Sequence, residues 1–250
     1  MGLVAAMLPG LAAVAALVFT WVSVTQVSNE LAISERGQIA DRHDKAWRGL
    51  SDSSASVRRG AIFALRSIAQ DSPREQAAVI DELSAYIRVR ATKKLSTTEK
   101  APDIKAALSV LRERDPSHDG NGTIDLRGAK LIDADLHGAD LTGANLVGTV
   151  LSNCNLEGAN LSGANLSRAS LRQGTLRGAN LTDAVLTGAD LAGADLTTAN
   201  LEAARLEGAK NLTSVQRPEA DLPTSGPTPT SSQPAEQRDA QRESALDSIR

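Results

Sequence analysis

Apolar residues follow several different patterns along the chain, and each pattern predicts a different structure. Residues 2 to 24 are almost continuously apolar and contain no charged side chain. At about 1.5 Å per residue, a helix of this length can cross about 30 Å of hydrocarbon. We therefore predict a transmembrane helix over residues 1–27. A cleaved signal peptide is the alternative, but the basic segment that normally opens such a peptide is absent.

The charges after the apolar segment predict its orientation. No Lys or Arg precedes it, whereas Arg36, Arg42 and Arg48 follow. Cytoplasmic segments of membrane proteins are enriched in Lys and Arg, so we expect a single-pass membrane protein with the bulk of the chain in the cytoplasm. Residues 28–50 carry mixed charges and predict a solvated juxtamembrane helix, with Gly37 as its weak point. A lipid-contacting or signalling helix is the alternative for this segment.

Residues 51–114 have apolar residues at helical spacing. The pattern breaks once, where Ser72, Pro73 and Glu75 have the spacing of a capping box at the start of a helix. This break predicts two antiparallel amphipathic helices, and a third helix is expected to begin at Pro102. We expect the three helices to form a HEAT-like region that caps the structure that follows.

Residues 115–122, with the sequence DPSHDGNG, loosely resemble a calcium-binding loop because they combine carboxylates with glycines. The bidentate Glu that such loops need at their twelfth position is missing. A turn-rich linker explains the segment better. We therefore predict a linker and no metal site.

From residue 123 the pattern changes to a period of five. Leucine occupies 17 consecutive positions five residues apart, from Leu126 to Leu206, and alanine fills 13 of the 17 positions two residues before them. Residues two apart in an extended chain share a face, so each Ala and Leu point inward and the residue between them, most often Asp or Asn, points outward. Of the two remaining residues, the second is Gly in 10 of 17 repeats, as a corner needs. Each pentapeptide is thus predicted to be a three-residue strand followed by a corner.

The segments ANLSG, ANLTD and ADLAG match the pattern A(D/N)Lxx and resemble the pentapeptide-repeat family. The resemblance implies a right-handed quadrilateral β-helix with four repeats per coil, covering residues 123–217 with a short C-terminal cap at NLTSVQ. Stacked coils of this kind bury their leucines against one another. Just over four coils, at about 4.8 Å between paired strands, give a height of roughly 20 Å. With its apolar N-terminal segment and helical region, the chain also resembles membrane-anchored pentapeptide-repeat proteins of actinobacteria.

Side chains 20 residues apart are expected to stack on the outer surface of such coils. The expected ladder consists of Asp140, Asn160, Asn180 and Asn200. Glu157 and Arg177 are also expected to be vertical neighbours and to form a surface ion pair worth at most about 1 kcal/mol. Residues 218–250 contain too few apolar side chains to fold and are expected to be a disordered tail.

Composition limits the chemistry that this fold can carry. The chain has 250 residues, a net charge of −3 and no aromatic residue after Tyr86. Its one cysteine, Cys154, excludes an internal disulfide and a thiolate metal cluster. Cys154 occupies an inward position that alanine usually fills, so we predict a buried structural thiol rather than a nucleophile.

The other reactive side chains do not suggest a site. His43 lies in a charged helix, His118 in the linker and His137 on the outer surface, and no phosphate-binding loop or nucleophile elbow is present. The one basic cluster consists of Arg168, Arg172 and Arg177. No aromatic side chain accompanies these arginines for bases to stack on, so local charge balance explains them better than nucleic-acid binding. We predict no catalytic, cofactor-binding or metal-binding residue and no enzymatic activity.

These expectations define a non-catalytic, membrane-tethered scaffold that binds a protein partner through the outer surface of its coils. The alternative is a DNA mimic that binds DNA gyrase or topoisomerase and protects it, as some pentapeptide-repeat proteins do. Residues 123 to 210 hold 10 Asp or Glu against 7 Lys or Arg, a net charge of only −3. The expected height matches only about six base pairs, so the mimic is the weaker hypothesis. The sequence specifies neither the partner nor the oligomeric state.

Overall fold

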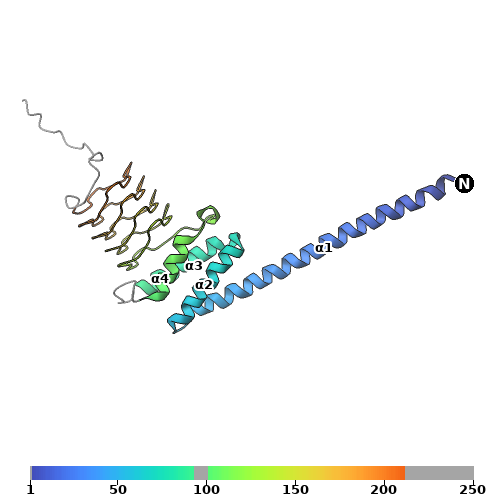
Figure 1. Ribbon diagram of the computed structural model, residues 1–250, viewed down its shortest axis with the longest axis horizontal. Coiled ribbons are helices and arrows are strands. Elements are labelled where there is room, and N and C mark those ends of the chain that lie inside the picture. Colours follow the sequence, from blue (N-terminus) through green and yellow to red (C-terminus); the bar gives the residue numbers. More distant parts are fainter. Residues whose placement is uncertain (1, 93–100, 212–250) are drawn as a thin grey trace, which may run out of the picture. The chain divides into compact units, whose positions relative to one another are not determined.

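A computed structural model gives the fold of the chain and describes residues 2–92 and 101–211 (Figure 1). For residues 2–18, 28, 29, 31, 32 and 35 only the backbone is described. The α-helices are α1 (Gly2–Leu50), α2 (Ala55–Asp71), α3 (Gln76–Ala91) and α4 (Pro102–Glu113), and the 3-10 helices are η1 (Pro73–Glu75) and η3 (Pro116–His118). All described residues belong to one compact unit. The predicted tail, and all but the first residue of the predicted C-terminal cap at NLTSVQ, lie outside the described residues.

The prediction of a membrane-spanning helix is wrong for the part of the chain that the structure describes. Among those residues, no helix is both long enough and apolar enough to cross a membrane. The described side chains of α1 begin at Phe19, and the helix continues without a break through Glu30, Arg36 and Asp41. Within the described side chains the apolar run is therefore short and is followed by charged residues, while the side chains of residues 2–18 lie outside the description. The predicted localisation, a single-pass membrane protein with most of the chain in the cytoplasm, is therefore also wrong for the described residues.

α1 is one helix of 49 residues, where two helices were expected. Gly37 does not interrupt it. The last turns of α1 pack against the next helices, because Ala46 and Leu50 are buried there and Ile39 is partly buried. The chain then turns sharply after Leu50 and enters α2.

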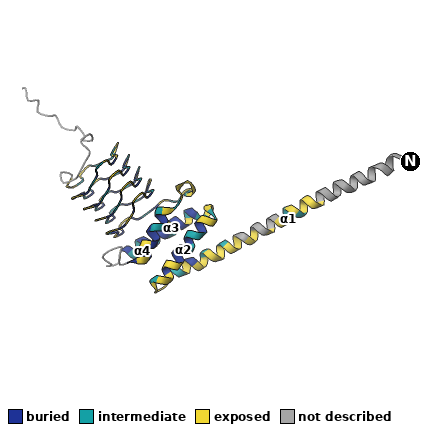
Figure 2. Ribbon diagram, viewed as in Figure 1, coloured by how far each residue is buried: buried dark blue, intermediate teal, exposed yellow. Residues whose placement is uncertain are grey.

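The helices α2, α3 and α4 bury one side each in a small shared core (Figure 2). Its fully buried side chains include Ile62, Leu65 and Ile68 of α2 and Ile80, Leu83 and Ile87 of α3. α4 begins at Pro102, as predicted. The predicted capping box is wrong: the Ser72 side chain makes no capping hydrogen bond, and η1 precedes the start of α3 at Gln76.

A charged group lies inside this helical core. Nε of Arg58 donates to Oδ2 of Asp103 at 2.6 Å, and the Tyr86 hydroxyl donates to the same oxygen at 2.6 Å. Nη1 of Arg58 also donates to the carbonyl oxygens of Asp52 and Ser53, which fixes the turn between α1 and α2. Arg58 is 5% exposed and Asp103 2%. The sequence gives no sign of this network, because its members come from three different helices.

The pKa values of Asp103 and Tyr86 shift in opposite directions. Burial by itself would raise the pKa of Asp103, but hydrogen bonds from Tyr86 and Arg58 and the charge of Arg58 lower it below its ordinary value. Burial, followed by the hydrogen bond to Asp103, raises the pKa of Tyr86 to about 12. The group is therefore an anionic Asp103 held by a cation and a neutral phenol.

Residues 124 to 210 form coils of 20 residues each. Parallel bridges join residues 20 apart, from Asp125 with Asn145 to Asp190 with Lys210, so four pentapeptides complete one coil. Each bridge has a repeating pair of bonds: Leu126 N donates to Asn145 O at 2.8 Å, and Asn145 N donates to Ile124 O at 2.9 Å. In the described repeats these bridges are isolated and do not extend into strands, because the chain turns after each one. The predicted three-residue strands are thus shorter than expected.

The interior of the coils contains leucine and small side chains. The leucines from Leu126 to Leu196 are at most 2% exposed, and the alanines facing them are similarly buried. Thr149 and Cys154 occupy two of the alanine positions and are also buried. Among the described residues, the burial decreases only in the last coil, at Leu201 and Leu206.

Every corner uses the same backbone conformation. The second residue after each leucine has a positive φ, as in Gly128 at 68° and Gly163 at 64°. The next N–H donates back to the leucine carbonyl, for example Ala129 N to Leu126 O at 3.0 Å, which closes a β-turn with positive φ at its third residue. Seven corners adopt this conformation without glycine. These residues are Asp133, Asn153, Arg168, Gln173, Asp183, Thr198 and Ala203.

Candidate functional site

The outward Asp or Asn that precedes most of the leucines is part of the backbone framework. In the repeat that begins at Leu161, four amide N–H groups donate to backbone carbonyls, two of them to the next coil and one to the preceding coil. The fifth, that of Ser162, donates to Oδ1 of Asn160 at 3.3 Å. The same contact recurs from Arg127 to Asp125 and from Thr197 to Asp195. The residue before leucine is therefore Asp or Asn because its side chain accepts from an amide that the coil-to-coil ladder does not use.

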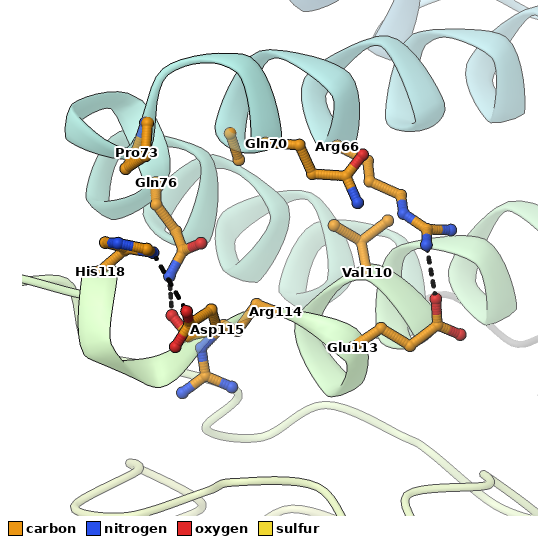
Figure 3. A pocket seen from close by; sticks show the side chains of 10 residues that line it. Arg66, Gln70, Pro73, Gln76, Val110, Glu113, Arg114, Asp115 and His118 are labelled. Carbon is orange, nitrogen blue, oxygen red and sulfur yellow. Dashed lines mark hydrogen bonds and ion pairs between the residues drawn. The ribbon is translucent and has the colours of Figure 1, made fainter.

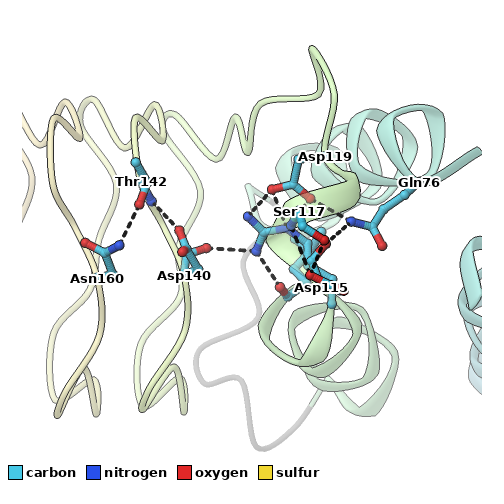
Figure 4. Close-up of polar contacts among 9 residues, drawn as sticks. Gln76, Asp115, Ser117, Asp119, Asp140, Thr142 and Asn160 are labelled. Carbon is cyan, nitrogen blue, oxygen red and sulfur yellow. Dashed lines mark hydrogen bonds and ion pairs between the residues drawn. The ribbon is translucent and has the colours of Figure 1, made fainter. Parts of the chain in front are cut away.

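The predicted amide ladder is only partly formed. Nδ2 of Asn180 donates to Oδ1 of Asn160 at 3.2 Å, which is the expected step. Nδ2 of Asn160 donates to the hydroxyl of Thr142 at 2.8 Å (Figure 4), and a hydrogen bond from Asn160 is also one of the contacts that lower the pKa of Asp140. The corner hydroxyls thus take part in the stacking, and this side of the coils presents a column of Thr142, Ser162 and Thr182.

The first residue of each corner is the position that differs most between the four sides of a coil. In the second coil these positions hold Val147, Ser152, Glu157 and Ser162, one on each side, and all four are at least partly exposed. The side chains that stand above and below them are 20 residues away, so each side presents its own vertical column. Recognition by the coils can use these columns without disturbing the interior.

Arginines from the helical region contact the exposed edge of the first coil. Nη1 of Arg88 donates to Asp125 O at 2.6 Å, and Nη1 of Arg114 donates to Asp140 O at 2.8 Å. In later coils the equivalent carbonyls accept from a leucine N–H, as Asn145 O does from Leu126. The arginines therefore satisfy edge carbonyls that have no preceding coil. The sequence analysis missed them, although Arg88 lies in the last turn of α3 and Arg114 directly follows α4, close to the start of the repeats.

The carboxylates of residues 115–122 are held by protein donors. Asp119 accepts from Nε and Nη2 of Arg114 at 2.9 and 2.7 Å and from Nε2 of Gln76 at 2.8 Å (Figure 4). Asp115 accepts from the amide and hydroxyl of Ser117, and these bonds lower the pKa of its carboxyl. Within the described ranges, no group of three or more His, Cys, Asp or Glu side chains is placed to hold a metal ion. The carboxylates act here as acceptors that fold the segment.

The three histidines lie in three separate places. His43 has its Nε2 3.1 Å from Oε1 of Glu82, His118 has its Nδ1 3.4 Å from Oδ2 of Asp115, and His137 has its Nδ1 2.8 Å from Oδ1 of Asp135. His118 lines a pocket of about 260 Å³ beside Gln76 (Figure 3). The charged side chains of that pocket are already engaged, for example Arg66 with Glu113 at 3.0 Å. This pocket therefore offers no free reactive group among the described residues that are labelled there.

Cys154 is buried at 1% exposure, and its thiol donates to Leu131 O at 2.8 Å. Burial raises the pKa of this thiol to about 12. A neutral, inaccessible thiol cannot act as a nucleophile or a metal ligand at neutral pH. The structure thus agrees with the structural role expected at an inward position.

The basic cluster is separated by the fold. Arg168, Arg172 and Arg177 belong to three successive corners, and Arg172 forms an ion pair with Asp190 at 2.9 Å. The predicted ion pair between Glu157 and Arg177 is wrong: these two described side chains make no such contact, although Gly158 N donates to Arg177 O one coil away. Charges that are adjacent in sequence are therefore distributed around the coil rather than gathered on one side.

The repeating backbone and its Leu-Ala interior can be compared with known proteins. The sequence profile described as pentapeptide repeats matches in 8 copies, over residues 124–158, 144–183 and 179–210. The chain belongs to the pentapeptide-repeat family. Members of this family fold as right-handed β-helices, which is the handedness that the resemblance implied. No curated protein matches the chain.

Solved structures of pentapeptide-repeat proteins are similar to part of this chain. The protein Rfr23 of the cyanobacterium Cyanothece 51142 is 34% identical over 43% of this chain and 79% of its own, with a TM-score of 0.40. A pentapeptide-repeat protein of Nostoc PCC 7120 is 33% identical, and the match covers 40% of this chain and 88% of the Nostoc protein, with a TM-score of 0.28. QnrB1, a plasmid-mediated fluoroquinolone resistance protein, is 21% identical, and the match covers 38% of this chain and 76% of QnrB1, with a TM-score of 0.24. At this level the likeness to QnrB1 says nothing about the activity of this chain.

Proposed function

We propose that this protein is a non-catalytic scaffold that binds a protein partner through the outer surface of its coils. The observation that carries the proposal is the use of each position in the repeat. Leucine and the small residue fill the interior, the outward Asp or Asn accepts an amide N–H, and the second corner residue sets the turn. The side chain of the first corner residue fills none of these three roles, so recognition is assigned to it.

The distribution of acidic residues does not favour the DNA-mimic alternative. Asp125, Asp190, Asp135 and Asp140 lie on four different sides of the coil, as the 20-residue period of the bridges requires. Three of them form ion pairs: Asp125 with Arg88, Asp190 with Arg172 and Asp135 with Arg112. A DNA mimic needs rows of unpaired acidic groups that imitate phosphates. The scaffold therefore remains the better supported function.

Site-specific photo-crosslinking tests the proposal. A photoreactive residue is placed in turn at Val147, Ser152, Glu157 and Ser162, which sample the four sides of one coil in the full-length chain. We expect one side, or two adjacent sides, to give a discrete protein adduct in cells, while the remaining sides give none. The absence of a discrete adduct from every side would contradict the scaffold. An adduct with gyrase would instead establish the mimic.

A further inference from the structure

Most arginines of the helical region have an acidic partner. Between residues 36 and 114 the chain has eleven arginines, and eight of them lie within ion-pair distance of a carboxylate. Within the described side chains, Arg36, Arg59 and Arg74 have no such partner. Two of these three, Arg36 and Arg74, line the same pocket. Unpaired cations that meet in one pocket point to an anionic ligand.

This pocket has a volume of about 470 Å³ and lies between two segments of the chain. α1 contributes Arg36, Ile39, Ala40 and His43, and the connection from α2 to α3 contributes Ser72, Arg74 and Glu75. The two guanidinium groups therefore come from different elements. The sequence analysis missed them because they are 38 residues apart along the chain, and only the packing of α1 against α2 brings them to one pocket.

The other charged groups decide which ligand fits. Among the described side chains, Glu75 is the one carboxylate in the lining. His43 faces Glu82 of α3, with Nε2 and Oε1 3.1 Å apart though not aligned as a hydrogen bond. A positive charge on His43 is therefore opposed by Glu82, and the cations left for a ligand are Arg36 and Arg74. Two guanidinium groups and one carboxylate give these described side chains a net charge of +1. The Coulomb attraction of such a site is stronger for a doubly charged anion than for a singly charged one.

The uncharged residues that line the pocket further limit the class of ligand that it can bind. No described aromatic side chain lines the pocket, so a nucleobase or another aromatic ring has nothing to stack on. Ser72 contributes a hydroxyl, which can donate to an oxyanion. The guanidinium fork matches the oxygens of a phosphate group. We propose that this pocket binds a small tetrahedral dianion of the phosphate class through Arg36 and Arg74.

The test uses full-length protein labelled with ¹⁵N and titrated with inorganic phosphate at constant ionic strength. We expect the Nε–H signals of Arg36 and Arg74 to shift in a saturable way. Arg36→Gln and Arg74→Gln are each expected to weaken binding about fivefold, because each removes one charged donor. Arg59→Gln is the matched control, since Arg59 also has no acidic partner among the described side chains but lies outside the pocket, and it should leave binding unchanged.

Glu75→Gln provides a change in the opposite direction. It removes the one carboxylate that the described residues contribute to the lining and is expected to tighten phosphate binding about threefold. Because this variant gains affinity, a failure to fold cannot imitate the result. Equal weakening by Arg59→Gln, or unchanged binding in both pocket variants, would overturn the proposal.

A second arm separates two sources of the phosphate group. Vesicles of phosphatidylcholine with and without phosphatidic acid are sedimented with the same proteins. Binding that requires both phosphatidic acid and the two pocket arginines assigns the site to a lipid headgroup, and saturable phosphate shifts without vesicle binding assign it to a dissolved phosphate monoester. The absence of both responses would refute the site.

Discussion

The helical region and the coils bury their backbones and apolar side chains in opposite ways. The helical core is built from contacts that occur once, and its centre is the buried group of Arg58, Tyr86 and Asp103. The coils repeat one set of bonds every five residues around an interior of leucine and alanine. Stability in the first region is concentrated in a few side chains, whereas in the second it is shared among neighbouring repeats. The two regions should therefore respond differently to single substitutions.

The largest effect is expected from Asp103→Asn. Asparagine keeps the shape of the side chain but leaves the Arg58 guanidinium buried without a counter-charge, which should lower the free energy of unfolding of the helical region by about 4 kcal/mol. Both tryptophans, Trp21 and Trp47, lie in α1. Their fluorescence during urea denaturation measures this region without a contribution from the coils.

A matched exposed pair supplies the control for that measurement. Asp71 forms an ion pair with Arg42 at 2.9 Å, and the two side chains are 54% and 47% exposed. Asp71→Asn should cost less than about 0.5 kcal/mol, because exposed ion pairs contribute little. Equal losses for the two variants would contradict a core whose stability is concentrated in the buried group.

Leu161→Ala is expected to have the next largest effect. Leu161 is fully buried, and removing its side chain should cost about 3 kcal/mol through lost burial and the cavity that remains. Leu141 and Leu181 stand below and above it, one coil away. The same substitution at each, measured by urea denaturation with circular dichroism, should give losses that agree within about 1 kcal/mol if stability is shared along the coils.

Glu82→Gln is expected to change the pH dependence of the helical region. Burial, opposed by the charge of His43, raises the pKa of Glu82. A carboxyl whose pKa is raised on folding contributes stability that is fully present below its unfolded value and is lost as the pH rises through the folded value. The variant should thus be more stable than the wild type by about 1 kcal/mol near pH 8, with the difference vanishing near about pH 4.

Thermal unfolding across this pH range, followed by tryptophan fluorescence, measures that difference. Asp81→Asn changes an exposed acidic residue on the same helix and serves as the control. A difference between the Glu82 variant and the wild type that stays constant with pH would contradict the assignment. A larger gain at acidic pH would contradict its sign.

The smallest effect is expected from Cys154→Ala. Alanine is the commonest residue at this inward position, so the substitution should change the free energy of unfolding by less than about 1 kcal/mol. The buried thiol, whose pKa is about 12, should react with a thiol reagent only as fast as the coils open. Rapid labelling of the folded wild-type protein would show that the interior is more accessible than the stacked coils suggest.

The sequence predicts the coils much better than the helical region, for a physical reason. The period of five is a direct consequence of a backbone that turns in the same way in each repeat, so the pattern appears in every copy. The buried group could not be predicted, because Arg58 and Asp103 are 45 residues apart and only the packing of α2 and α4 brings them together. The membrane segment shows a further limit: an apolar run was used to assign a span, and the described part of α1 did not support it.

The candidate surface was also predicted only in part. Placing Leu and Ala inside assigned recognition to the outer surface, but the outward Asp and Asn looked available when they in fact accept backbone amides. The arginines that cover the first coil, such as Arg88 and Arg114, depend on contacts between distant segments. The local sequence pattern therefore predicted the repeating unit, whereas the contacts between distant regions could be identified only in the structure.

The correspondence between one repeat and one side of a coil has a consequence for how such a chain changes over time. Loss or gain of a single pentapeptide rotates every later repeat by a quarter turn, so a column on one side is continued by residues from the next. Loss or gain of four pentapeptides keeps all columns aligned and changes only the height. An insertion of five residues thus changes which side chains stand above one another on each side, while an insertion of twenty residues only lengthens the existing columns.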